Sequence, residues 1–98
     1  MSRPVQFRLE AQAEYDSAID WYEQQRAGLG ADFIRKIAEV IARISANPLL
    51  HAKVYHDVRK AVVRRFPYLV LYQVEPTDIV IVSVFHTSRD PSDWKSRV

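Results

Sequence analysis

The segment Val58–His86 constrains the fold of this chain more than any other. It contains three apolar runs, rich in valine and aromatic residues, and the two short breaks between them carry Pro67 and Pro76. Such residues favour β-strands, and breaks of this length join antiparallel neighbours. The segment therefore predicts a three-stranded antiparallel meander. The predicted strands are 58–66, 68–75 and 79–86.

The last of these runs, 79–85, is apolar on both faces apart from Ser83. A strand that is apolar on both faces is normally packed above and below and has a neighbour on each side. Near the N-terminus, Val5–Leu9 alternates between apolar and polar residues and predicts one more strand. We expect it to lie beside 79–85, which gives the order first, fourth, third and second predicted strand.

Two helices are predicted between the first strand and the meander. Apolar residues recur at helical spacing from Glu10 to about Arg26 and again over Ala31–Ala46, and a glycine-containing break separates the two segments. Such a short break predicts an antiparallel helical hairpin. Leu49–Asp57 is predicted to be a loop or a short irregular strand. The fold class is therefore α+β, a single domain over 1–98 in the order β-α-α-β-β-β.

Charge is distributed unevenly along the 98 residues. Residues 1–50 hold six Lys/Arg and seven Asp/Glu, whereas residues 51–98 hold eight and five. A basic strand suits a phosphate-rich or acidic partner. The chain has no cysteine, which excludes disulfides and cysteine metal sites, and we expect no metal and no cofactor. No apolar run approaches the length of a membrane span, so we expect no membrane association and a cytoplasmic location. The cations of 53–72 are Lys53, Arg59, Lys60, Arg64 and Arg65.

His86 ends the last predicted strand, and Arg89 follows within a turn. A histidine near arginines suits general acid–base cleavage of RNA, with cations that stabilise the phosphorane-like charge. The alternative, which we favour from the residues alone, is structural: His86 bonds into the turn and Arg89 pairs with Asp90 or Asp93. Trp94 either contacts a partner or pins the tail. The candidate cations are Arg59, Arg64, Arg65 and Arg89, and His51 and His56 are taken as surface residues.

Several short motifs, in this order and spacing, resemble the RelE/ParE superfamily of toxins from type II toxin–antitoxin (plasmid stabilisation) modules. The resemblance spans nearly the whole chain and implies the same order of strand, two helices and meander. It also implies a cognate antitoxin as partner. The motifs are Ala13–Tyr22, Gly28–Phe33, Asn47-Pro48, Arg59, Phe66-Pro67-Tyr68 with Tyr72, and His86–Trp94.

The superfamily divides into ParE-like inhibitors of DNA gyrase and RelE-like nucleases that cut mRNA on the ribosome. RelE-type nucleases commonly carry arginine directly after the aromatic residue that opens the third strand, where this chain has Leu69 after Tyr68. This difference favours a ParE-like toxin. The alternatives are a RelE-like nuclease using Arg59, Arg65, His86 and Arg89, or a degenerate member that binds only its antitoxin. The expected contacts to target or antitoxin are Arg59, Arg64, Arg65, His86, Arg89 and Trp94.

Overall fold

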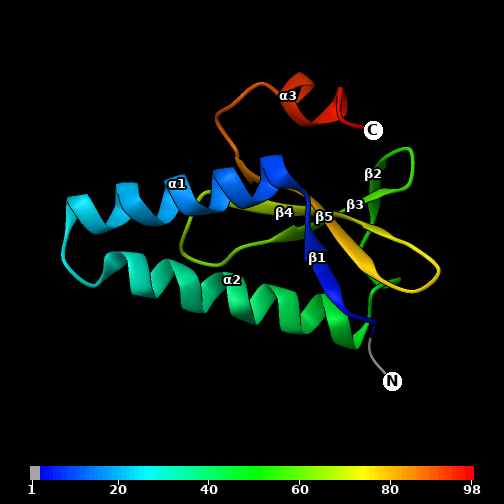
Figure 1. The fold of residues 1–98 in the computed structure, drawn as a ribbon, viewed down its shortest axis with the longest axis horizontal. Coiled ribbons are helices and arrows are strands. Elements are labelled where there is room, and N and C mark those ends of the chain that lie inside the picture. The colour runs from blue at the N-terminus through cyan, green and yellow to red at the C-terminus, as the bar shows by residue number, and fades with distance from the viewer. Residues whose placement is uncertain (1–2) are drawn as a thin grey trace.

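The structure, a computed structural model, describes residues 3–98 (Figure 1). The predicted single domain, 1–98, includes Met1 and Ser2, which lie outside the described residues. No helix within 3–98 is long and apolar enough to span a bilayer. The elements in chain order are β1 (Val5–Phe7), α1 (Leu9–Gln25), α2 (Leu29–Ala46), β2 (Lys53–Tyr55), β3 (Val58–Val62), β4 (Tyr68–Val74), β5 (Ile79–His86) and α3 (Ser92–Lys95).

The five strands form one mixed sheet in the order β1-β5-β4-β3-β2. As predicted, β5 is interior: it runs parallel to β1 and antiparallel to β4. The predicted α+β class and the order of the four predicted strands are confirmed. Leu49–Asp57, predicted to be a loop or a short irregular strand, contains β2. This strand pairs with β3 at the edge of the sheet, with a register shift between Lys53 and Tyr55.

The two long helices form a hairpin against one face of the sheet, and its closed end extends beyond the sheet (Figure 1). Phe33 lies near the centre of the aromatic packing there, with its ring centroid 5.3 Å from Tyr22, 5.1 Å from Phe66 and 5.0 Å from Tyr68. A second, smaller core holds Trp94 of α3. Its other buried members are Val58, Leu71 and Phe85.

The first strand is shorter than predicted. β1 stops at Phe7, and Leu9, expected in that strand, is 87 % exposed as the first residue of α1. The Arg8 N–H donates to the Ile81 carbonyl at 3.0 Å, and the helix begins directly afterwards. Alternation over Val5–Leu9 could not show this end, because one turn of an amphipathic helix fits the same residues.

The predicted strand 58–66 also ends early, at Val62. Arg64 and Arg65 lie in the turn to β4, where Arg65 has a φ of 69°. This turn brings Phe66 into the helix-side core, whereas Val58 lies in the smaller core on the other face of the sheet. Val62 is exposed, because the small core on its face covers only the Val58 end of β3.

The break between the helices is also shorter than predicted, because α2 begins at Leu29 rather than Ala31. The Glu23 carboxylate accepts the N–H groups of Gly28 and Gly30 at 3.0–3.1 Å and so satisfies donors that the first helical turn leaves free. Gly28 has a φ of 89°, which glycine adopts readily. This tight connection sets the position of the hairpin's closed end.

Candidate partner-binding site

The predicted site residues lie in four separate places on the fold, and Trp94, on α3, is described below. His86 and Arg89 lie beside α1, Arg64 and Arg65 lie in the β3–β4 turn, and Arg59 is on β3. His86 and Arg89 line a hollow of about 460 Å³ that we call the α1–β5 groove. Its other lining residues are Trp21, Tyr22, Pro67 and Tyr68.

The groove is aromatic with polar donors at its rim. Trp21 is 56 % exposed, and the Tyr68 ring meets the His86 ring edge-on with centroids 5.1 Å apart. Burial raises the pKa of Tyr68, and Tyr22 nearby adds to the shift while Arg89 opposes it. Tyr68 is therefore a neutral hydroxyl near neutral pH. Large aromatic and arginine side chains at a shallow surface are the common anchors of protein interfaces.

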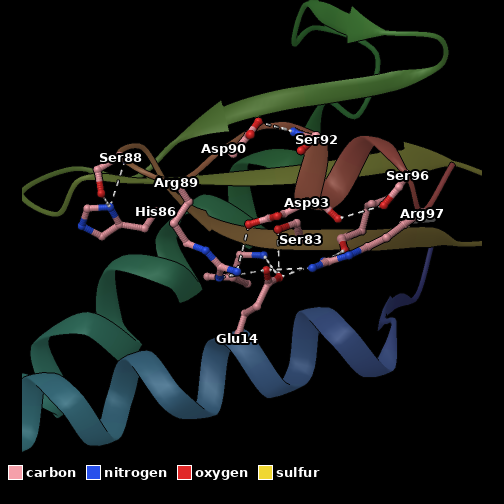
Figure 2. Close-up of polar contacts among 12 residues, drawn as sticks. Glu14, Ser83, His86, Ser88, Arg89, Asp90, Ser92, Asp93, Ser96 and Arg97 are labelled. Carbon is pink, nitrogen blue, oxygen red and sulfur yellow. Dashed lines mark hydrogen bonds and ion pairs between the residues drawn. The ribbon is translucent and has the colours of Figure 1, made fainter.

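His86 is held in one tautomer by the turn that follows it. The Ser88 backbone N–H lies 3.1 Å from His86 Nδ1, and the Ser88 hydroxyl lies 2.7 Å from the same atom (Figure 2). A backbone N–H can only donate, so Nδ1 accepts and the proton of the neutral ring is on Nε2. His86 thus offers a donor. For Nε2 to act as a general base, the ring proton would have to move to Nδ1, and Nδ1 could then no longer accept the hydrogen bond from the Ser88 N–H.

Arg89 is tied to carboxylates rather than free. It lies 3.1 Å from Asp93 and 3.6 Å from Glu14. Figure 2 shows Glu14 between Arg89 and Arg97, which approach it from opposite sides. The predicted structural alternative, His86 bonded into its turn and Arg89 paired with Asp93, is what the structure contains. About half of the Arg89 side chain is nevertheless exposed and can meet a partner.

Glu14 and Arg97 close the edge of β5 where β1 ends. Glu14 Oε1 accepts from the Ser83 hydroxyl at 2.8 Å and from the Val84 N–H at 3.2 Å, and Arg97 donates to the Val82 carbonyl at 3.1 Å. The pKa of Arg97 is raised, chiefly by its hydrogen bonds to Glu14 and partly by the charge of that carboxylate, against an opposing effect of burial. The pair therefore satisfies strand groups that β1 no longer reaches.

Arg59 is engaged with the backbone of the loop before β2. It donates to the Leu49 carbonyl at 3.1 Å and to the His51 carbonyl at 2.6 Å. His51 is half-buried, with its ring edge-on to Tyr72, so its prediction as a surface residue is wrong, because the loop folds back over β4. Arg59 thus holds this loop in place.

Arg65 lines a second hollow, which we call the hairpin-tip pocket. It lies between the closed end of the helical hairpin and the β3–β4 turn, and measures about 460 Å³. Arg64 is exposed on the same turn. The pocket is lined by Tyr22, Arg26, Leu29, Asp32, Arg35, Lys36, Arg65, Phe66 and Pro67.

Trp94 is only 4 % exposed and belongs to the smaller core. Its ring meets Tyr55 edge-on at 5.8 Å, and the Lys95 ammonium lies 5.2 Å from the Tyr55 ring centroid. In this structure Trp94 therefore pins α3 to the sheet instead of facing a partner. Of the six predicted contact residues, it is the one with almost no exposed surface.

Sequence reasoning missed Glu14, Ser88 and Arg97. Glu14 and Arg97 are 83 residues apart, and no local pattern links an acidic residue on a helix to an arginine near the C-terminus. The signal for Ser88 was available, because a serine two residues after a strand-ending histidine is well placed to bond back to it. No group of three His, Asp or Glu side chains within 3–98 is arranged to hold a metal ion.

Comparison with known proteins gives a family match and a likeness to solved structures. A family model described as "ParE toxin of type II toxin-antitoxin system, parDE" matches residues 5–91. A solved structure titled "Chromosomal ParDE TA system from P. aeruginosa" is similar with a TM-score of 0.77 at 16 % sequence identity, over 89 % of this chain and 98 % of that one. At that identity the likeness shows the fold. No curated protein matches.

Proposed function

The chain belongs to the ParE toxin family of type II toxin–antitoxin systems, and from this membership we propose that it inhibits DNA gyrase by binding it. As the toxin component of such a module it has an antitoxin as its partner. The resemblance found in the sequence is confirmed over residues 5–91. Because gyrase acts on DNA in the cytoplasm, the proposal includes a cytoplasmic location.

The observation that carries binding over cleavage is the Ser88 N–H on His86 Nδ1. It leaves His86 with a fixed donor at Nε2, which suits a contact and not proton exchange. The α1–β5 groove then supplies the target contact, with Trp21 as an aromatic anchor and Arg89 as a cation. Arg64 and Arg65, on the neighbouring turn, extend the basic surface.

The alternative function, RelE-like cleavage of mRNA on the ribosome, requires the histidine and the cations to converge on one phosphate. Arg59 is bonded to two loop carbonyls, and Arg65 lines a hollow that His86 does not line. The placement of these side chains gives the nuclease less support than it gives a binding inhibitor. A degenerate toxin that binds only its antitoxin remains the third alternative.

The test is a supercoiling assay with purified protein and DNA gyrase, run beside cell-free translation. We expect loss of supercoiling while translation continues, and an inhibitory concentration raised about tenfold by Trp21→Ala or Arg89→Ala, as for interface anchors. Lys53→Ala is the charge control, since Lys53 lies on β2 and pairs only with Asp57 in the part of the chain described.

Arrested translation with new codon-phased RNA ends, and gyrase unaffected, would replace this function with the nuclease. Inhibition of neither process would leave the degenerate toxin. Induction in cells without antitoxin gives the parallel readout, in which filamentation and DNA damage precede any fall in protein synthesis. Circular dichroism of each variant separates a lost contact from a lost fold.

A further inference from the structure

The hairpin-tip pocket has an apolar floor under a basic rim. Tyr22 and Phe66 form the aromatic part of the floor, with ring centroids 4.8 Å apart, and burial raises the pKa of Tyr22. Leu29 and Pro67 complete it. The rim carries four cations and one carboxylate, a formal charge of +3. These rim residues are Arg26, Arg35, Lys36, Arg65 and Asp32.

The rim cations differ in how far their charge is already used. Asp32 pairs with Arg35 and lies 3.7 Å from Arg26, and Lys36 pairs with Glu39 at 3.1 Å. Arg65 makes no ion pair and no side-chain hydrogen bond with any residue of 3–98 that the structure describes. It therefore brings an uncompensated charge to the mouth of the pocket.

The backbone at Arg65 adds a second, independent observation. Its φ of 69° lies in the left-handed region, which glycine enters freely and a residue with a Cβ enters at a cost. Glycine would serve this turn better. The Arg65 side chain thus extends from a strained backbone position, and such positions cluster at ligand-binding and active sites.

We propose that the hairpin-tip pocket binds an acidic segment of the antitoxin, which packs one aromatic side chain on Tyr22 and Phe66 and sets its carboxylates against Arg65 and the rim. This inference rests on the antitoxin partner of the proposed function and adds where and by what chemistry it is held. A disordered acidic segment that folds on binding can use such a small pocket.

The rim favours a protein segment over a nucleic acid. Asp32 lies among the rim cations and pairs with Arg35, so the free positive charge at the rim is local and does not form a continuous row. Single-stranded nucleic acid is normally bound by cations that follow its backbone for several nucleotides, beside successive stacking platforms. Here the cations surround one hollow, and its aromatic floor fits a single side chain.

The probe is a capped pentapeptide of composition Asp-Glu-Trp-Glu-Asp, titrated into the ¹⁵N-labelled full chain. We expect amide shifts centred on Arg26, Asp32 and Phe66. Binding should weaken about tenfold when the four acids are replaced by their amides, and by a similar factor when tryptophan is replaced by alanine. Affinity should also fall as salt rises.

Arg65→Gly is the decisive variant, because folding and binding should move in opposite directions. We expect an unchanged or higher melting temperature, since the left-handed strain is relieved, together with about tenfold weaker peptide binding. Lys60→Ala is the matched control. It removes one positive charge from β3, close in sequence to Arg65 but outside the pocket, and should change the affinity less than about twofold.

Equal binding by the wild type and Arg65→Gly would overturn the proposal, as would shifts centred on another surface. Tighter binding of a five-nucleotide DNA strand at the same amides would reassign the pocket to nucleic acid. The gyrase assay is read separately on the wild-type protein. Peptide binding without gyrase inhibition supports the pocket and refutes the target, whereas inhibition without peptide binding does the reverse.

Discussion

Arg97 and Glu14 form a two-pronged ion pair across 83 residues of sequence. Arg97 Nη1 lies 3.1 Å from Glu14 Oε1, and Arg97 Nη2 lies 3.1 Å from Glu14 Oε2. Both side chains are largely buried, with 14 % and 10 % of their surface exposed. The pair joins α1 to the C-terminal tail, and Glu14 also lies 3.6 Å from Arg89, which lines the α1–β5 groove (Figure 2).

Replacing Arg97 with methionine should lower the free energy of unfolding by about 2 kcal/mol. This loss is larger than that for breaking an exposed ion pair and smaller than that for a fully buried one. Glu14 stays charged in the variant, but Ser83 and Val84 still donate hydrogen bonds to it. Urea unfolding measures the loss, and hydrogen exchange should accelerate in α3. Lys53→Met, which breaks the exposed pair with Asp57, is the control and should cost less than about 0.5 kcal/mol.

A double-mutant cycle of Glu14→Gln and Arg97→Met isolates the interaction between the two side chains. We expect a coupling energy above about 1 kcal/mol, since the groups touch directly and share buried donors. A coupling near zero would mean that the tail is held by its other contacts, among them Trp94 in the smaller core and Arg8, which donates to the Arg97 carbonyl at 3.0 Å.

Gly30→Ala should destabilise the helical hairpin. A Cβ at position 30 would meet the Ile19 carbonyl oxygen and Glu23 Oε1 at 3.0 Å, so α1 and α2 would have to separate. Overpacking of this kind costs about 1–3 kcal/mol, which exceeds the gain of about 1 kcal/mol from the better helix propensity of alanine. Thermal unfolding gives the sign, and a more stable variant would contradict the close approach of the helices.

Acid should weaken the turn that leads into α3. The pKa of Asp90 lies below its ordinary value, mainly because the Ser92 N–H donates to it at 3.0 Å. A depressed folded pKa stabilises the turn above the unfolded value and loses that effect as pH falls through the folded value. NMR of the side-chain carboxyl should show Asp90 taking up its proton at a lower pH than an ordinary aspartate, and the Ser92 amide shift should change over the same pH range. Titration of Asp90 at the ordinary pKa would disprove the contact.

Tyr72→Phe should cost about 1 kcal/mol. The Tyr72 hydroxyl donates to the Pro48 carbonyl at 2.7 Å, and the variant leaves that acceptor without its partner. The loop that follows Pro48 should exchange its amides faster, since it loses one of its contacts to the sheet while those of Arg59 remain. Chemical denaturation measures the free energy of unfolding, and an unchanged m-value would show that the variant unfolds in the same two-state way. An unchanged free energy of unfolding would mean that water takes the place of the hydroxyl at the Pro48 carbonyl.

The sequence was sufficient to predict the order of the sheet and the helical hairpin. β5 is apolar on both faces, which places it inside the sheet, and the apolar stripe of α2 has one period throughout. Both are local patterns repeated over many residues, and such patterns survive tertiary packing. The prediction of β1 was wrong at Leu9, because the alternating pattern could not show that Glu14 and Arg97, far apart in the sequence, bond the next groups of β5 in place of a longer strand.

The candidate site was predicted less well, because its geometry arises from distant residues. The apolar pattern of 58–66 placed Arg64 and Arg65 in a strand, yet Arg65 occupies a left-handed turn that its residue type disfavours. Arg59 was predicted as a cation available to a partner, although two loop carbonyls hold it. Trp94 was correctly given two alternatives, and its burial follows from Leu71 and Phe85 on the face opposite the helices.

The most direct test of binding without catalysis compares His86→Gln with His86→Ala in the gyrase supercoiling assay. A glutamine amide can place an N–H donor near the position of Nε2 but cannot exchange protons as an imidazole does. The account predicts that His86→Gln stays within about threefold of the wild type while His86→Ala loses about tenfold or more. Equal loss in both variants, together with loss of RNA cleavage that the wild type performs, would contradict it.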